Sequence, residues 1–508
     1  MSVLDDLRSS FRAGRLEYLV GAGASISAGL PDWNELNRRL LGEFLARKYS
    51  QLEFEDRDLE VAAAAFVEQF GREAVVDHVR DEGRRRFPSS LRKALYPRVA
   101  FYPTSYHFEL VAALNSAQRL RLARPQRLIS FNFDNLLEQA GKILGSRLEA
   151  VWDGSGRKPP YGHVVHPHGF VPPSGTLHRG KLVLSERDYL EADADWAQSV
   201  LRPLFRKSGV DLLLVGLSIA DPRLRKLLLQ RMESFTPAGR QNRIFAILPE
   251  SHAPANSEFI ERVTHRLLRE NVRHFWRSWQ LEVVYIKGYD EVPFLLRQIR
   301  LGSNGTDWLK RGRDALKALA PTFYSLVRLD GWQLVAVQAL KNSVEFIRRR
   351  FAVPRDEEVH VGAFVPSARG STIELAFRYT GREDARKDVV LTAEAARRRL
   401  NVADLTKPQG AAGRCFLTGA PFEAQIGMGL DLNFSREMSR DWNSERTFSS
   451  VLCVPIFDGP EWVPMGVAFV TSNSVTPFWS NVGNRKPDYL ALQGLLRSLF
   501  DAVVRYTY

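Results

Sequence analysis

The sequence predicts an α/β protein in two parts, a doubly wound parallel sheet followed by an α+β domain with an antiparallel sheet. Three observations support this. Short apolar runs at residues 16–20, 128–131 and 212–215 are typical of buried strands, and each is followed at once by glycine or polar residues. Helical apolar spacing lies between these runs, for example at residues 36–48. After linker-like residues at 302–305, the pattern changes to paired strands.

The remaining elements of the first part follow from the same patterns. Apolar residues recur at helical spacing in several further stretches and form two more short runs typical of strands. The expected helices are 52–80, 108–120 and 196–205, and the expected last strands are 243–248 and 281–286.

Length and composition set the number of domains and the class of protein. A chain of 508 residues suggests about two to four domains, each able to bury its own core. We expect a first domain over residues 1–300, a linker and helix over 301–329, and a second domain over 330–508. Apolar residues make up 44% of the chain and charged residues 25%, as in ordinary globular proteins.

The charge and the cysteine content exclude several classes of site. The net charge of +13 is spread along the chain rather than gathered in a tail, so nucleic-acid binding is possible but not indicated. Only Cys415 and Cys453 are present, which excludes a disulfide framework and a zinc site built from cysteines, and we expect no metal. The first residues, MSVLDDLRSS, lack the apolar core of a signal peptide, so we expect none, and no apolar run is long enough to span a bilayer. We expect a cytoplasmic protein that does not contact membranes.

The first strand ends in a turn of small residues, which are Gly21, Ala22, Gly23, Ala24 and Ser25. Small side chains let backbone N–H groups approach a phosphate closely, and the start of a helix adds further donors. The stretch continues through Pro31, Asp32 and Trp33 into the next helix. The turn is therefore a candidate site for a nucleotide.

Two further motifs follow later strands. Asn132 and Asp134 come directly after the strand at 128–131, at the end where open α/β sheets bind ligands. The alternative for Asp134 is an Asx turn that caps the next helix. Gly216 and Ser218 follow the strand at 212–215, with Asp221 just beyond.

A cluster of three histidines lies in the stretch HVVHPHGF at residues 163–170. Because no carboxylate or cysteine stands nearby at ligand spacing, we do not expect a metal site. Histidine suits general-base catalysis, since its pKa lies near the working pH. His168, followed by glycine, is the preferred base. His166 is the alternative, because it lies two residues away and is expected to share a strand face with His168.

These motifs, in this order, resemble the sirtuin-like family, whose NAD-binding domain is Rossmann-like. The family's loop runs glycine-alanine-glycine, then serine or alanine-glycine, then proline-aspartate-aromatic, and this chain has the same string between Gly21 and Trp33. The resemblance covers residues 16–289. The alternative is a nucleotide-binding loop of another doubly wound protein.

The resemblance implies that NAD is the substrate and gives the motif residues their roles. The residues implied to bind NAD are Gly21, Ala22, Gly23, Ala24, Ser25, Pro31, Asp32, Trp33, Gly216, Ser218, Asp221, Gly288 and Tyr289. His168 would be the general base, Asn132 would help to hold the attacking water, and Asp134 would contact the nicotinamide amide or support the pocket.

The chain departs from protein-deacylating sirtuins in one respect. Those enzymes carry a four-cysteine zinc domain beside the acyl-lysine groove, and two cysteines cannot build it. The sequence instead resembles zinc-less bacterial relatives that act as anti-phage effectors. This resemblance implies an NAD+ hydrolase that breaks the nicotinamide–ribose bond through an oxocarbenium-like state. It would release nicotinamide and linear or cyclised ADP-ribose, and deplete NAD in an abortive infection.

Three alternative functions stay open. The first is a non-catalytic sensor of NAD or ADP-ribose. The second is an NAD-dependent protein deacylase or ADP-ribosyltransferase. The third is a nucleic-acid-guided effector, which only the positive charge suggests.

The second part of the chain resembles a GAF domain. Its expected elements are a helix at 332–351, strands at 359–364 and 372–378, a helix at 410–419, strands at 448–457 and 463–472, and a helix at 490–504. The family's glycines and its proline-isoleucine and glycine-valine pairs correspond to Gly410, Gly413, Gly419, Ser450, Pro455, Ile456, Gly466 and Val467. GAF domains bind small ligands or dimerise. We expect a regulatory domain in a homo-oligomer, with an unknown trigger that is a phage factor or a small ligand.

Overall fold

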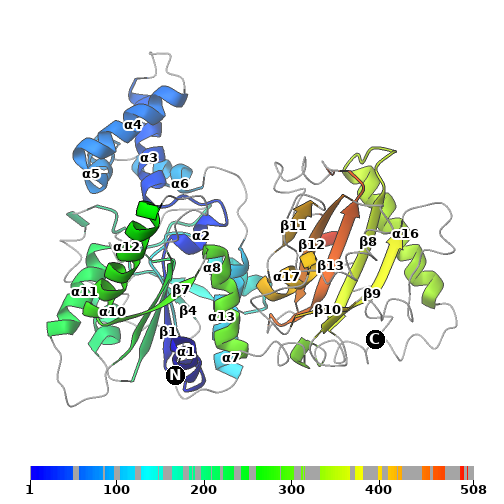
Figure 1. The fold of residues 1–508 in the computed structure, drawn as a ribbon. Coiled ribbons are helices and arrows are strands. Elements are labelled where there is room, and N and C mark those ends of the chain that lie inside the picture. Colours follow the sequence, from blue (N-terminus) through cyan, green and yellow to red (C-terminus); the bar gives the residue numbers. More distant parts are fainter. Residues whose placement is uncertain are drawn as a thin grey trace. The chain divides into compact units, whose positions relative to one another are not determined.

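The computed structural model divides the chain into two compact units, Met1–Arg300 and Leu301–Tyr508 (Figure 1). The residues that the structure describes are 2–49, 56–83, 86–96, 103–119, 127–146, 148–152, 163–174, 182–185, 187–188, 196–206, 209–217, 221–233, 242–250, 259–286, 288–302, 310–312, 314, 332–366, 372–380, 399–402, 410–419, 421–425, 449–457, 462–474, 477, 492, 494–496 and 500.

The first unit is built on a seven-stranded parallel sheet. Its strands are β1 Leu16–Val20, β2 Leu128–Ser130, β3 Glu149–Val151, β4 His163–Val165, β5 Asp211–Val215, β6 Ile244–Pro249 and β7 Leu281–Ile286. They lie in the order β3-β4-β2-β1-β5-β6-β7, so the chain first builds one side of β1 and then crosses to the other. Ligands of open α/β sheets bind where the strand order reverses in this way. The predicted parallel-sheet fold is confirmed.

Helices cover both faces of this sheet, as buried parallel strands require. They are α1 Val3–Arg12, α2 Gly23–Ile26, α7 Ser105–Arg119, α8 Leu136–Ile143, α10 Trp196–Arg206, α11 Pro222–Glu233, α12 Phe259–Ser278, the 3-10 helix η3 Tyr289–Glu291 and α13 Val292–Leu301. Figure 1 shows α10, α11 and α12 on one side of the sheet and α7, α8 and α13 on the other. Leu19 and Ile129 of the strands pack with Leu201 of α10 and Leu227 of α11 in one core.

Four helices lie between β1 and β2 in the chain, and we call residues 33–95 the helical segment. They are α3 Trp33–Lys48, α4 Asp56–Phe70, α5 Arg72–Gly83 and α6 Phe87–Leu95, and they gather at one end of the first unit (Figure 1). The helical region expected over 52–80 contains two helices, α4 and α5. The chain breaks it at Gly71, whose φ of +84° lies in the left-handed region that glycine tolerates.

The helical segment shares its core with loops that follow the strands. Leu40 and Phe44 of α3 pack in one apolar cluster with Phe133, Val171 and Leu184. Phe133 follows β2, and Val171 and Leu184 come after the histidine stretch of β4. The segment therefore rests on the carboxyl-terminal edge of the sheet.

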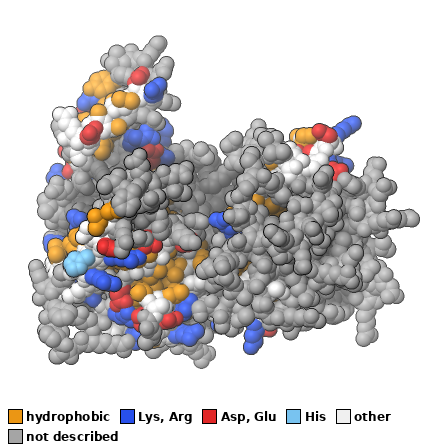
Figure 2. Space-filling model, in the orientation of Figure 1, with side chains coloured by type: hydrophobic (Ala, Val, Ile, Leu, Met, Phe, Trp, Pro, Cys, Tyr) orange, Lys and Arg blue, Asp and Glu red, His pale blue; other side chains and the backbone are white. Residues whose placement is uncertain are grey.

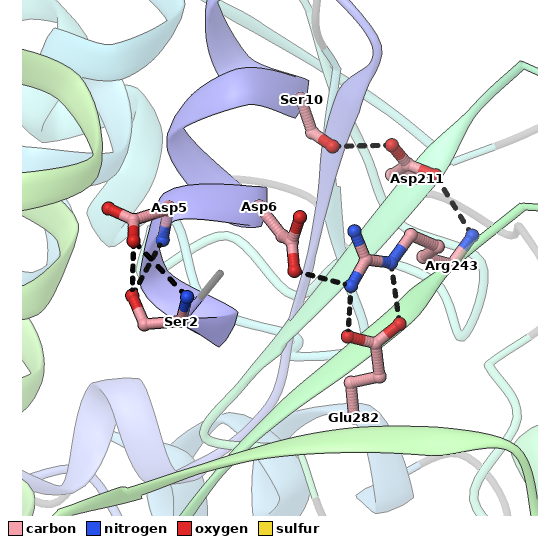
Figure 3. Close-up of polar contacts among 7 residues, drawn as sticks. All are labelled: Ser2, Asp5, Asp6, Ser10, Asp211, Arg243 and Glu282. Atoms are coloured by element: carbon pink, nitrogen blue, oxygen red, sulfur yellow. Dashed lines mark hydrogen bonds and ion pairs between the residues drawn. The ribbon is translucent and has the colours of Figure 1, made fainter.

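Polar contacts fasten α1 to the opposite, amino-terminal edge (Figure 3). Arg243, just before β6, donates to Asp6 of α1 at 2.7 Å and to Glu282 of β7 at 2.5 Å. Ser10 of α1 donates to Asp211 at the start of β5 at 2.5 Å. These contacts join α1 to three neighbouring strands, far from the residues predicted to bind a ligand.

The second unit is built on a six-stranded antiparallel sheet of order β10-β9-β8-β13-β12-β11. Its elements are α16 Trp332–Arg350, β8 Val359–Pro366, β9 Thr372–Thr380, β10 Arg399–Asn401, α17 Gly410–Thr418, β11 Phe422–Gln425, β12 Ser450–Phe457 and β13 Pro464–Ser472. The predicted antiparallel sheet is confirmed, including the β12–β13 pair. The two short strands β10 and β11 were not expected.

The core of this unit lies between the sheet and α16. Leu340 and Ile347 of α16 pack with Val361 of β8 and Val470 of β13. Leu496 joins the same core. Of the linker and helix expected over 301–329, the structure describes 301–302, 310–312 and 314, and residues 310–312 and 314 are helical. Most of the closing helix expected over 490–504 lies outside the described residues.

Candidate functional site

Asn132 joins the loop after β2 to the turn after β1. Its side-chain amide donates to the backbone oxygen of Gly21 at 3.0 Å and to the Ser25 hydroxyl at 2.9 Å. The Ser25 hydroxyl in turn donates to Asp134 Oδ2 at 2.8 Å. All three side chains are buried. The structure therefore brings together three of the residues that the sequence predicts for one site.

Asp134 also caps the helix that follows it. Its Oδ1 accepts the backbone N–H of Leu136 at 3.0 Å, which is the Asx turn considered as the alternative. Burial raises the pKa of Asp134, against the lowering effect of the Leu136 N–H and the Ser25 hydroxyl. Because both carboxylate oxygens are engaged, this geometry suits a residue that supports the turn and Asn132.

The glycines after β1 bring two loops into close contact. The N–H groups of Gly21 and Gly23 donate to Val215 O and Gly216 O, each at 2.9 Å, so they point at the β5 loop. A Cβ on Gly21 would lie 2.5 Å from the Cα of Leu217. We expected these N–H groups to face a phosphate. The structure instead gives the glycines a packing role, because β1 and β5 are hydrogen-bonded neighbours whose loops leave the sheet together.

His166 is held between two acceptors. Its Nδ1 donates to the backbone oxygen of Asn132 at 2.8 Å, and its Nε2 lies 2.9 Å from Glu138 Oε1. Burial alone would lower the pKa of His166, but the Glu138 carboxylate and the Asn132 carbonyl raise it. A histidine whose two nitrogens both donate has no lone pair to accept a proton. The alternative base is therefore disfavoured, and His166 instead fixes the backbone of Asn132.

His168 lies in a turn after β4. Its Nε2 is 3.9 Å from Asp221 Oδ2, and its ring stands edge-on to Phe131, with centroids 4.8 Å apart. The expected strand face shared with His166 is wrong: β4 ends at Val165, and Gly169 N–H donates to His166 O to close the turn. The Asp221 carboxylate therefore lies at the outer limit of ion-pair distance from His168.

The other predicted residues lie around this centre. Pro31 is buried, Asp32 is exposed and caps α3 by accepting the Glu35 N–H at 2.8 Å, and Trp33 lies 6.3 Å from the Phe133 ring. Gly216 has a φ of +60°. Gly288 and Tyr289 follow β7, the outer strand, where Tyr289 O accepts the Tyr106 hydroxyl. Ser218 lies outside the described residues.

Three residues make contacts at the site that were not expected from the sequence. Glu138 was not singled out, although it lies in the first turn of α8, which begins just after Asp134. Phe131 was counted only as part of a strand. Asp221 was expected to bind NAD, which stays a prediction, and the structure brings its carboxylate to 3.9 Å from His168 Nε2. Only the fold reveals that contact, because β4 and α11 are far apart in the chain.

Two searches of the described residues found nothing. Within the ranges that the structure describes, no three His, Cys, Asp or Glu side chains are grouped to hold a metal ion. Among the helices of those same ranges, none is both long and apolar enough to span a membrane.

The comparison with known protein families concerns the residues around Asn132 and His168. Residues 126–284 match the family model of the SIR2-like domain. The SIR2-like match contains Asn132, His168 and Asp221, whereas the turn at 21–25 precedes it. The structure joins this turn to the matched range through Asn132.

Solved structures similar to the chain fall into two groups. A Sir2 homologue in complex with NAD is 16% identical and covers 59% of this chain and 94% of its own, with a TM-score of 0.29. The A. aeolicus nlh2 GAF domain in an inactive state is 15% identical and covers 38% and 97%, with a TM-score of 0.21. The GAF domain of an Acinetobacter phosphoenolpyruvate-protein phosphotransferase is 14% identical and covers 37% and 94%, with a TM-score of 0.20. No curated protein matches the chain.

Proposed function

We propose that the chain is an NAD+ hydrolase, which splits the nicotinamide–ribose bond and releases nicotinamide and ADP-ribose. The observation that carries the proposal is the contact of the His168 ring with Phe131, the residue before Asn132, at a centroid distance of 4.8 Å after the neighbouring strands β2 and β4. The SIR2-like match over this range supports NAD as the substrate. The turn at 21–25 and the residues Pro31, Asp32 and Trp33 would lie along the bound NAD.

In the proposed reaction, His168 accepts a proton from the water that attacks the anomeric carbon of the nicotinamide ribose. The C–N bond to nicotinamide breaks with its electron pair, and the base leaves neutral. Asp221 stabilises the imidazolium of His168 from 3.9 Å. Asn132 is fixed from two sides, by its own amide bonds and by His166, so its orientation costs little entropy during the reaction.

The role in the cell is part of the same proposal and rests on the resemblance to anti-phage effectors. Loss of NAD stops the metabolism of an infected cell, which limits phage production. The second unit, with its GAF-like order of elements, would bind the trigger or mediate a homo-oligomer and so control the first unit. On the face drawn in Figure 2, the described basic side chains lie among acidic and hydrophobic ones, which does not favour nucleic acid as the partner.

Product analysis tests the proposal. The full-length protein is incubated with NAD, and the products are separated by chromatography. We expect nicotinamide and ADP-ribose, or its cyclised form, in equal amounts and without an added protein substrate. A requirement for an acylated or acceptor protein would contradict the proposal, as would tight binding of NAD with no turnover in the presence of phage lysate.

A further inference from the structure

The backbone of His168 is held by a short segment that follows it. We call residues 182–185 and 187–188 the strap. Val183 N–H donates to His168 O at 2.9 Å. Asp188 Oδ2 accepts the N–H groups of Leu184 and Ser185, each at 2.9 Å, and Ser185 is fully buried. The Asp188 carboxylate therefore fixes the part of the strap that bonds to His168.

The Asp188 carboxylate is itself held by the helical segment. Arg80 of α5 forms a bidentate pair with it, with Nη1 2.6 Å from Oδ1 and Nη2 2.7 Å from Oδ2. The guanidinium also stacks on Phe87 of α6, with its carbon 5.2 Å from the ring centre. Burial alone would raise the pKa of Asp188, but Arg80 and the strap N–H groups lower it. A two-point pair of this kind fixes orientation as well as distance.

A second contact, from the residue that follows the helical segment, reaches the other side of the same loop. The Tyr96 hydroxyl, just after α6, donates to Val171 O at 2.8 Å. Val171 N–H donates to Phe133 O at 2.8 Å, which ties this point to the loop that carries Asn132. The loop between His168 and Val171 is thus held at both ends by helices that are far away in the sequence.

We propose that Arg80 is a positioning residue for His168, and that the helical segment sets the place of the catalytic base through the Arg80–Asp188 pair. The inference rests on the proposed function of His168. Arg80 touches no reacting atom in this account. It acts through Asp188, the strap and the hydrogen bond from Val183 to His168 O.

The test compares Arg80→Gln with Arg38→Gln in the full-length protein. Arg38 of α3 makes a similar two-point pair with Glu35, at 2.7 Å for both bonds, and its side chain is 29% exposed against 28% for Arg80. Its partner Glu35 lies on its own helix, in the first turn that Asp32 caps, and not on the strap. Arg38→Gln therefore removes the same kind of two-point arginine–carboxylate pair, but one without the connection to His168.

Two readouts are measured. For nicotinamide release we expect Arg80→Gln to lower kcat about 10- to 100-fold, because a misplaced catalytic group loses most of its effect. The KM for NAD should change less than about twofold, since binding residues are untouched. Hydrogen exchange of the amides in 166–171 and 182–188 should become roughly tenfold faster or more. Arg80→Lys keeps the charge but loses the planar guanidinium that makes two parallel bonds to Asp188. Its kcat and its exchange rates should therefore lie between those of the wild type and those of Arg80→Gln.

The outcomes separate this inference from the proposed function. If exchange around His168 is the same in Arg80→Gln and Arg38→Gln, the inference is wrong. It is also wrong if exchange rises while kcat stays unchanged. If neither the full-length wild type nor the wild-type unit Met1–Arg300 releases nicotinamide, the proposed function fails, and the exchange data still decide whether Arg80 holds the His168 loop.

Discussion

Replacing Glu109 by glutamine should destabilise the first unit far more than the same replacement at Glu35. Glu109 of α7 is fully buried and faces two arginines of α13. Its Oε1 accepts Arg297 Nε at 2.7 Å, and its Oε2 accepts Arg300 Nη2 at 2.9 Å. Glutamine removes the negative charge that both buried guanidinium groups bind and turns an amide donor toward them. Breaking a buried ion pair from one side costs about 3–5 kcal/mol.

Glu35 offers a matched control because it also accepts from two arginines. Arg38 and Arg39 bind it at 2.6–2.7 Å, but its side chain is 31% exposed. Water replaces the lost contacts there, so Glu35→Gln should cost less than about 1 kcal/mol. Calorimetry of the full-length variants measures both effects. In large domains Tm falls by roughly 2–4 °C per kcal/mol, so we expect a drop of about 6 °C or more for Glu109→Gln. Equal shifts for the two variants would refute the reasoning.

Two further predictions concern the candidate site. Gly216→Ala should destabilise the first unit by about 1–3 kcal/mol and reduce nicotinamide release. The reason is that Gly216 has a φ of +60° and that a Cβ there would lie 2.5 Å from Ala24 N. A variant that unfolds in denaturant with the stability of the wild type would contradict this prediction. Glu138→Gln should change the pH dependence of stability, since Glu138 raises the pKa of His166 above 6.5. The protonated His166 favours folding fully below pH 6.5, and this contribution is lost as the pH rises through its folded-state pKa. The stability difference between wild type and variant should therefore shrink toward alkaline pH, and a difference that grows there would oppose this assignment.

The parts of the fold that could be predicted are those set by local sequence. The run Leu16–Val20 is buried at every position, and Gly21 follows it where the chain must pass close to Leu217. Asp134 was expected to cap a helix or to serve the site, and its two oxygens do the first and also hold Ser25. Such features depend on a few neighbouring residues, so their residue types reveal them.

The parts that could not be predicted depend on contacts between distant segments. Arg80 and Asp188 are 108 positions apart, and each is an ordinary surface-type residue in the sequence. The pairing of Asp221 with His168 likewise appears only once α11 is placed beside the turn after β4. The Gly21 N–H donates to Val215 O because β1 and β5 are neighbours in the sheet. The glycine motif alone does not reveal that order of strands.

The most direct test of the account is the rate of nicotinamide release from NAD by the wild type, His168→Ala and His274→Ala. The full-length chain and the unit Met1–Arg300 are both measured, because the second unit is proposed to control the first. His274 is an exposed histidine of α12 and serves as the control. The account predicts release by the wild type in at least one of the two forms, the same rate for His274→Ala, and none for His168→Ala. Undiminished release by His168→Ala, or no release by either wild-type form, would contradict it.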